Sequence, residues 1–373
     1  SYCKKIKKFL QKKIGYRYPN NPYSVDEFKR VDFYYFTNNL QQTFIRLRFT
    51  NFGAFNYCKS LFNRKISIPG VFSDKEVYYK QYESNIDPFL RFCHVQDIDP
   101  AGWITVQADD LNWDDDIRSN VQVEACVDWK KVKPEKKDMI APFSVASFDI
   151  ECKSEDNVSM PVAKTEDGDY TNDKVIQIGT TVRKFGEKEC FLKHMITLKD
   201  ADPLPGVVME CYQKESEVLL AWTRMIQKLD PDIITGYNIY GFDFQYIYYR
   251  AEKFNIENEF GELGRIQDDI SELEIKKLSS SALGDNIMKI LPMKGRVTID
   301  LFKVITRDHN LSSYKLDSVA EHFMGQKKVD LPPKKIFEYQ DIDAAHRSEI
   351  ANYCRQDCEL CNNLMDNFPE IEA

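Results

Sequence analysis

Residues Ser144–Lys153 read SVASFDIECK, an apolar segment whose second half carries two acids, Asp149 and Glu151. Side chains alternate between the two faces of a strand, so acids two positions apart point to the same face. Two carboxylates side by side in a mostly apolar strand are costly unless a positive charge lies between them. Mg²⁺ and Mn²⁺ prefer such oxygen ligands. The stretch predicts a metal-binding strand end, and the alternative is an ordinary strand end with two solvated acids.

The bulk properties exclude several classes of protein. The chain has 373 residues, enough for roughly two or three domains with a sizeable core. A formal net charge of -8 argues against a broadly basic nucleic-acid coat but leaves room for a local basic groove. The ten cysteines are scattered, which indicates reduced thiols of an intracellular protein, in nucleus or cytoplasm. We expect no signal peptide and no membrane partner, because no run approaches the roughly 18 apolar residues of a span.

A charged stretch divides the chain. Lys130–Lys137, reading KKVKPEKK, contains a proline and predicts a boundary between an N-terminal domain, 1–137, and a second domain, 138–373. In the first we expect a lysine-rich solvated helix face near the start, a hairpin of strands 31–36 and 43–49, and a helix over 52–62.

The second domain reads as strands alternating with helices, an α/β or α+β fold. The expected strands are 144–153, 175–182, 191–198, 233–236 and 297–301, with a projecting hairpin over 275–291. The expected helices are 215–229, 241–253, 314–324 and 344–368.

Two further acids stand where ligand sites form. The strand 232–236 runs into YNIYGFD, which places Asp243 just beyond a strand end at the start of a helix. On the late helix Tyr353 and Asp357 are four residues apart and share one face. Taken singly, Asp243 is more simply a helix-start acid and Asp357 a capping or ion-paired acid.

Together these patterns form an ordered set that resembles the three exonuclease motifs of B-family DNA polymerases of eukaryotic replicative and large-DNA-virus type. The surrounding words match too: SFDIEC, DPDIITGYNIYGFD, GRVTIDLF, LSSYKLDSVAEHF and YCRQDCEL. Upstream, YESNIDPFLRF resembles a segment of the family's N-terminal domain. The resemblance covers roughly Phe72–Phe368 and is weak over the first seventy residues.

The resemblance implies an RNase H-like exonuclease domain with a mixed central sheet, preceded by a mixed α+β N-terminal domain. The family's metal-holding acids fall on Asp149, Glu151, Asp243 and Asp357, all of them intact. In the family they hold two divalent cations, Mg²⁺ or Mn²⁺, which activate a water and stabilise the leaving 3′ oxygen. The implied reaction is 3′→5′ hydrolysis of single-stranded or mispaired DNA ends.

The resemblance also assigns three residues that touch the DNA or the water. Tyr353 would position the attacking water and the scissile phosphate. Asn238 and Phe242 would hold the frayed 3′ end by hydrogen bonding and by packing on a base or sugar. The alternative for Tyr353 and Phe242 is a role as core aromatics. The hairpin over 275–291 falls where the family has a strand-separating hairpin.

The palm motifs of the family, such as YGDTDS, do not occur in the sequence. We therefore expect a proofreading fragment that does not itself synthesise DNA. Its partners would be a primer–template 3′ end, the remainder of a polymerase chain and replication accessory proteins.

Three alternatives remain open. Cys354, Cys358 and Cys361 have the spacing of a radical-SAM iron–sulfur motif, but they lie on an expected helix and read better as small packed side chains. A non-catalytic nucleic-acid-binding module of the same fold is the second alternative. A stand-alone RNA exonuclease with the same kind of site is the third.

Overall fold

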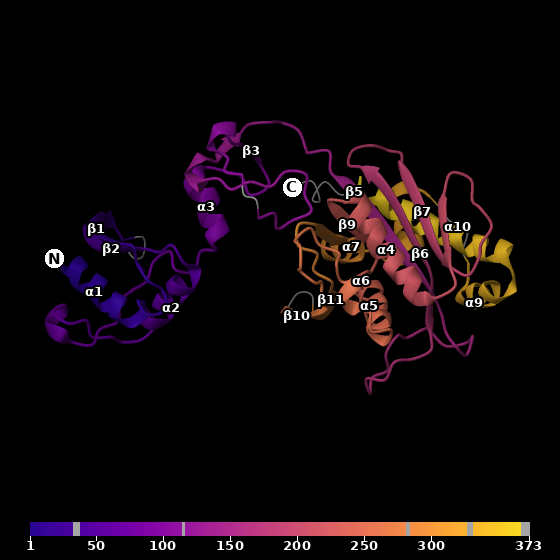
Figure 1. Cartoon of the computed structure of the whole chain (residues 1–373), viewed down its shortest axis with the longest axis horizontal. Helices are drawn as coiled ribbons and strands as arrows, with labels where there is room; N and C mark the ends of the chain where they lie inside the picture. Colours follow the sequence, from indigo (N-terminus) through magenta and orange to yellow (C-terminus); the bar gives the residue numbers. More distant parts are fainter. Residues whose placement is uncertain (33–37, 114–115, 281–283, 327–330, 367–373) are drawn as a thin grey trace. The chain divides into compact units, whose positions relative to one another are not determined.

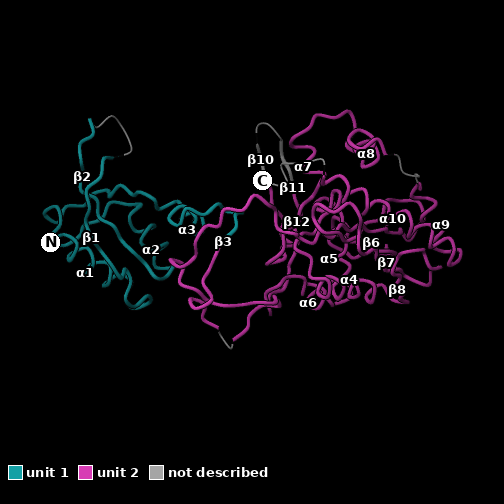
Figure 2. Tube along the Cα trace, turned by 90° about the horizontal axis from the view of Figure 1, so that it is seen from above, with its two compact units in different colours: residues 1–104 teal, residues 105–373 magenta. Residues whose placement is uncertain are grey.

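The computed structural model describes the chain except for residues 33–37, 114–115, 281–283, 327–330 and 367–373 (Figure 1). The described residues form two compact units, 1–104 and 105–373 (Figure 2). The sequence predicts a domain boundary at residue 137, where strands begin to alternate with helices. This domain boundary stays a prediction.

The first unit is built on two helices that share one core. Its elements are α1 Tyr2–Ile14, β1 Ser24–Val31, β2 Gln41–Arg48, α2 Phe52–Phe62 and α3 Pro88–Gln96, with β3 Trp103–Thr105 at its end. Ile6, Leu10 and Ile14 recur at helical spacing on α1 and pack against Cys58 and Leu61 of α2. The lysines of α1 are exposed, apart from the partly buried Lys7, as a solvated helix face predicts.

The hairpin of this unit corrects the sequence-based prediction. Its first strand is Ser24–Val31, earlier than the predicted 31–36, of which residues 33–36 lie outside the described part of the chain. The strand carries two acids followed by two basic residues, Asp26-Glu27 and Lys29-Arg30. Asp26 pairs across the hairpin with Arg46 at 2.7 Å and Arg48 at 2.6 Å, and such cross-strand pairs favour this register.

The second unit is a mixed six-stranded sheet between helices, which confirms the predicted fold class. The strand order is β12-β9-β5-β6-β7-β8. The strands are β5 Ser144–Lys153, β6 Lys174–Lys184, β7 Leu192–Leu198, β8 Val208–Tyr212, β9 Ile233–Gly236 and β12 Val297–Asp300. The small strand β4 Lys133–Glu135 precedes them, and β10 Glu274–Ser280 and β11 Gly284–Ile290 form the predicted hairpin.

Helices cover both faces of this sheet (Figure 1). They are α4 Glu215–Leu229, α5 Asp243–Lys253, α6 Glu257–Phe260, α7 Leu301–Asp308, α8 Leu316–Met324, α9 Pro333–Ile342 and α10 Ala344–Met365. On one face Phe148 of β5 packs against Trp222 of α4 and Phe244 of α5, with ring centroids 5.0 and 5.4 Å apart. The sequence missed α7, α9 and the edge strand β8.

The other face of the sheet is shaped to receive α10. Three residues of β6 at alternate positions bond to this helix or its end, in the pairs Gln177–Arg347, Thr181–Asn362 and Arg183–Asp366. Between them lies Gly179, where an added Cβ would come within 2.7 Å of the Cys354 sulfur. The glycine therefore lets α10 lie directly on the strand, and the flanking polar pairs set its position along it.

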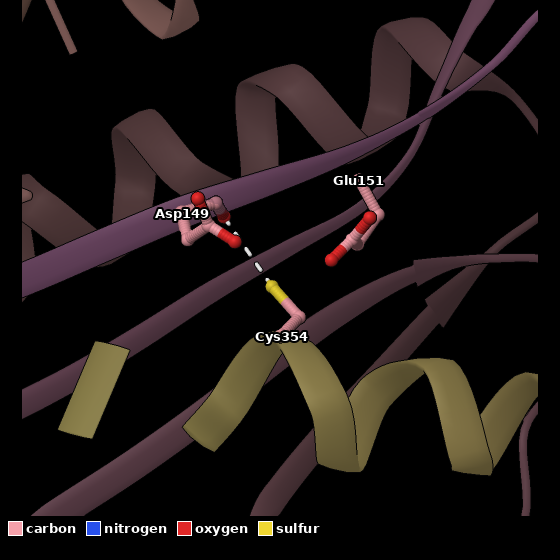
Figure 3. A group of neighbouring side chains, drawn as sticks. All are labelled: Asp149, Glu151 and Cys354. Carbon is pink, nitrogen blue, oxygen red and sulfur yellow. Dashed lines mark hydrogen bonds between the residues drawn. The ribbon is translucent and has the colours of Figure 1, made fainter. Parts of the chain in front are cut away.

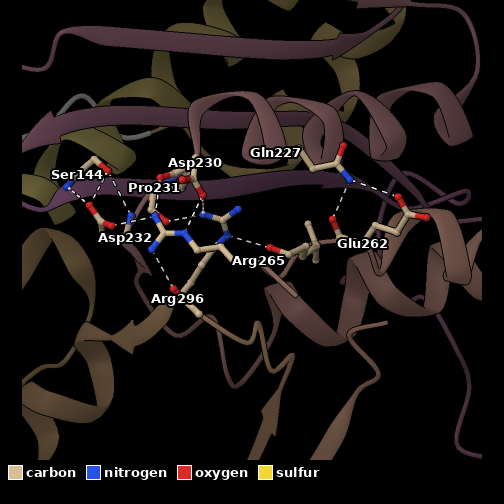
Figure 4. Close-up of polar contacts among 10 residues, drawn as sticks. Ser144, Gln227, Asp230, Pro231, Asp232, Glu262, Arg265 and Arg296 are labelled. Atoms are coloured by element: carbon tan, nitrogen blue, oxygen red, sulfur yellow. Dashed lines mark hydrogen bonds and ion pairs between the residues drawn. The ribbon is translucent and has the colours of Figure 1, made fainter. Parts of the chain in front are cut away.

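An ion-pair network lies at the amino-terminal ends of the parallel strands (Figure 4). Arg265 contacts Asp230 at 2.7 Å and Asp232 at 2.8 Å, and Arg296 contacts Asp230 at 2.6 Å. Asp232 also accepts a hydrogen bond from the Ser144 amide at 2.8 Å. Asp230 and Asp232 precede β9, Arg296 precedes β12, and Ser144 is the first residue of β5, so Arg265, from the segment after α6, helps to align three strands whose carboxyl ends lead to the acids described next.

Candidate active site

Asp149 and Glu151 project from β5 toward α10 (Figure 3). Their Cα atoms pair with Gly179 and Gln177, two of the β6 residues that face this helix. One carboxylate oxygen of each acid and the Cys354 sulfur all lie within 4.8 Å of one another. Glu151 is buried and Asp149 partly buried, so neither acid is the freely solvated strand end of the alternative interpretation.

Asp243 is the first residue of α5 and is 3% exposed. Its backbone amide and that of Ile150 donate hydrogen bonds to its carboxylate. Burial raises the pKa of Asp243 to about 7; the Asp300 charge adds to this, and the two amide bonds oppose it. The bond to Ile150 places this acid beside the β5 segment that carries Asp149 and Glu151.

The charges of the other three acids act on Asp149. Burial, first, and then the negative charges of Asp243, Asp357 and Glu151 raise the pKa of Asp149 well above its usual range. Asp357 comes from α10 and is 8% exposed. The acids of α5 and α10 are thus near enough to act on the charge of Asp149 at the carboxyl ends of the parallel strands β5 and β9, while the tight group within 4.8 Å is Asp149, Glu151 and Cys354.

This donor set fits divalent cations. Buried carboxylates that raise one another's pKa are electrostatically unfavourable unless positive charge enters among them. Oxygen-rich sites of this kind suit hard cations such as Mg²⁺ and Mn²⁺. The residues that would hold such ions are the four acids that the sequence assigned.

Asp300 binds the turn before α5, which contains Asn238 and Phe242. The Asp300 carboxylate accepts hydrogen bonds from the amides of Asn238, at 2.8 Å, and Tyr240, at 3.0 Å. Asn238 has φ 61°, and its carbonyl accepts from the Phe242 amide at 3.0 Å. An added Cβ at Gly241 would lie 2.3 Å from the Asn238 Oδ1 atom, so the turn requires glycine there.

Asp300 was not among the residues that the sequence assigned to the site. It is 2% exposed, ends β12 and caps α7 by accepting from the Phe302 amide at 3.0 Å. The only sequence signal was an acid at the end of an apolar strand, within the GRVTIDLF segment. The Asn238 and Tyr240 amides that it binds are about sixty residues away in the sequence, so only the folded chain shows that Asp300 organises the turn.

Tyr353 and Phe242 are partly buried and pack against the core cluster of the sheet. The Phe242 ring lies 5.2 Å from that of Tyr246. This placement accommodates both a DNA-contacting role and the core role that the sequence left open. Cys354, Cys358 and Cys361 are buried free thiols on α10, in agreement with their interpretation as packed side chains.

Comparison with known proteins identifies the family. The sequence model described as "DNA polymerase family B, exonuclease domain" matches residues 79–319. The chain belongs to DNA polymerase family B. The exonuclease domain of B-family polymerases is RNase H-like, and the mixed sheet of residues 105–373 agrees with that fold.

Relatives of this B-family chain come from viruses and eukaryotes. It is 26% identical to a DNA polymerase of Pyramimonas orientalis virus, over 96% of this chain and 44% of the relative. It is 32% identical to a DNA polymerase of Acanthamoeba polyphaga mimivirus, over 80% of this chain and 21% of the relative. It is 34% identical to the DNA polymerase delta catalytic subunit of Arabidopsis thaliana, over 90% of this chain and 30% of the relative. The chain thus spans less than half the length of these relatives.

The family match assigns an exonuclease domain to this chain, and exonuclease domains of the family generally use divalent metals. Within the described ranges, no helix is both long and apolar enough to cross a bilayer.

Proposed function

We propose that this chain hydrolyses DNA from the 3′ end, one nucleotide at a time, as the proofreading part of a B-family polymerase. The convergence of Asp149, Glu151, Asp243 and Asp357, expressed in the strongly raised pKa of Asp149, is the observation that carries the proposal. The single-stranded or mispaired 3′ terminus is the substrate, and the remainder of a polymerase chain and replication accessory proteins are the partners.

The four acids would hold two divalent cations, Mg²⁺ or Mn²⁺, which supply a nucleophilic water at neutral pH and charge stabilisation for an in-line displacement. Ionisation of the acids at neutral pH is favoured only when cations are present, because the carboxylates repel one another. The phenol of Tyr353, on the same helix face as Asp357, would orient the attacking water.

Asn238 and Phe242 would bind the last nucleotides of the strand. Asn238 lies in a turn whose backbone is bonded to Asp300 and whose Gly241 packs against the Asn238 side chain. The side-chain amide of Asn238 would hydrogen-bond to a phosphate, sugar or base of the DNA. The partly buried Phe242 ring offers a face against which any base can pack, which gives affinity without sequence preference.

The decisive experiment is a gel assay on 5′-labelled single-stranded DNA. We expect a ladder that shortens from the 3′ end in Mg²⁺ and disappears in EDTA or in the Asp149→Ala/Glu151→Ala variant. The matched control is Glu166→Ala/Asp167→Ala, which removes the same charge from an exposed loop and should keep the ladder. A labelled RNA of the same sequence tests the alternative of an RNA exonuclease.

A folded wild-type protein that binds the DNA but does not shorten it in Mg²⁺ or Mn²⁺ would contradict the proposal. That result would favour the non-catalytic binding module.

A further inference from the structure

Cys354 lies beside the two acids of β5. Its thiol donates a hydrogen bond to the Asp149 backbone carbonyl at 3.5 Å, and its sulfur lies within 4.8 Å of a carboxylate oxygen of both Asp149 and Glu151 (Figure 3). The side chain has no exposed surface. A sulfur donor and two oxygen donors therefore face one another from α10 and β5.

A second sulfur adjoins the first. Cys358 lies one helical turn from Cys354, and burial and then the proximity of the two thiols raise the pKa of Cys354. Both sulfurs lie over Gly179, whose added Cβ would be 2.7 Å from the Cys354 sulfur and 3.2 Å from the Cys358 sulfur. The glycine thus allows both thiols to approach β6, the strand next to β5, on which the acids lie.

Sulfur and oxygen donors select different cations. Mg²⁺ and Mn²⁺ take oxygen ligands, and would leave the thiols protonated. Zn²⁺ and Cd²⁺ accept mixed sets of thiolate and carboxylate, typically four donors in a tetrahedron. Cys354, Asp149 and Glu151 supply three donors, which leaves the fourth position to a water molecule.

We propose that Asp149, Glu151 and Cys354 form a binding site for one soft divalent cation, Zn²⁺ or Cd²⁺, that competes with Mg²⁺ for the same carboxylates. On binding, the thiol releases its proton to solvent as the sulfur–metal bond forms. The consequence for catalysis, inhibition by Zn²⁺, rests on the proposed nuclease function, whereas the binding site itself does not.

The test is a titration of the metal-free protein with Cd²⁺, followed by the ultraviolet charge-transfer absorbance of the thiolate–cadmium bond. The exposed Cys126 and Cys211 are first replaced by serine to remove background binding. We expect saturation near one equivalent, and suppression of the band by excess Mg²⁺. Cys354→Ser should weaken Cd²⁺ binding at least about tenfold, since even indirect partners of a metal contribute that much.

The matched control is Cys361→Ser, which replaces another buried thiol on the same helix that is not among the three donors. It should keep the band and its midpoint. An unchanged band in Cys354→Ser, an equal loss in Cys361→Ser, or no competition by Mg²⁺ would each overturn the proposal. A Cys354-dependent band in a protein without Mg²⁺-dependent nuclease activity would support this site while contradicting the proposed function.

Discussion

The carboxylate of Asp300 accepts the backbone amide of Asn238 at 2.8 Å, and this bond ties the end of β12 to the turn that leads into α5. A second oxygen of the same carboxylate accepts the Tyr240 amide at 3.0 Å. Asp300 therefore acts as a positioning residue for both the proposed DNA-contacting Asn238 and the acid Asp243.

Replacing Asp300 by alanine should disturb the turn rather than remove a metal ligand. It would leave buried amides without acceptors, each costing about 1–3 kcal/mol. We expect a nuclease KM for single-stranded DNA that rises about tenfold or more, from misplacement of Asn238, with a lower kcat as Asp243 shifts. Steady-state kinetics on oligonucleotides measure both constants.

The control for this variant is Asp308→Ala, at the far end of the helix α7 that Asp300 caps, where the acid is exposed and paired with its neighbour Arg307. Its kinetics should match the wild type. If Asp300→Ala also keeps wild-type kinetics, the carboxylate does not position the turn.

Gly179→Ala should push α10 away from the sheet. The new Cβ would meet the Cys354 sulfur at 2.7 Å, the Met195 sulfur at 3.1 Å and the Cys358 sulfur at 3.2 Å. Overpacking of this kind costs roughly 1–3 kcal/mol. It should lower nuclease activity because α10 carries Tyr353 and Asp357.

The matched rescue is the double variant Gly179→Ala/Cys354→Ala, which removes the nearest sulfur. Chemical denaturation should show that the double variant recovers part of the stability lost in Gly179→Ala. Strictly additive losses would mean that the clash lies elsewhere.

The stability of the metal-free protein should fall as pH rises. The pKa of Asp243 is about 7 in the folded state against an ordinary value of 3.8, so the folded protein holds more protons over that interval. Stability conferred by the protonated acid is present below pH 4 and is lost as pH rises through 7. Each pKa unit corresponds to roughly 1.4 kcal/mol, so the loss is of the order of a few kcal/mol.

Urea denaturation in EDTA between pH 4.5 and 8 measures this slope. In Asp243→Asn the slope should be smaller, because the group no longer titrates. Mg²⁺ should restore stability mainly at the higher pH, where the acids that would bind it are ionised. Equal slopes in wild type and variant would exclude Asp243 as the titrating group.

Arg250→Ala should strongly destabilise residues 105–373. The guanidinium meets the Glu215 carboxylate through two bonds of 2.6 Å, and both side chains are almost completely buried. Removing the arginine leaves a buried, uncompensated charge, at a cost of about 3–5 kcal/mol. Thermal or urea unfolding measures the loss.

Arg118→Ala is the comparison for this pair, since Arg118 and Asp116 are 71% and 77% exposed. The change should cost less than about 1 kcal/mol, because water screens exposed ion pairs. Similar losses in both variants would show that burial does not set the energy of the Arg250–Glu215 pair.

The sequence by itself determined what short-range periodicity governs. The alternation of strand side chains placed Asp149 and Glu151 on one face, and helical spacing predicted α2 and α4 with the observed bounds. These features depend on neighbours within a few residues, which the sequence displays directly.

Only the tertiary structure decided the features that depend on distant partners. Strand β1 was misplaced because Asp26, a charge within the strand, is paired with Arg46 and Arg48 of β2 rather than with its own neighbours. Asp300 gained its role from amides about sixty residues away, and Gly179 gained its role from the sulfurs of α10. Such contacts join segments that are adjacent only after the sheet has formed, so no local pattern in the sequence predicts them.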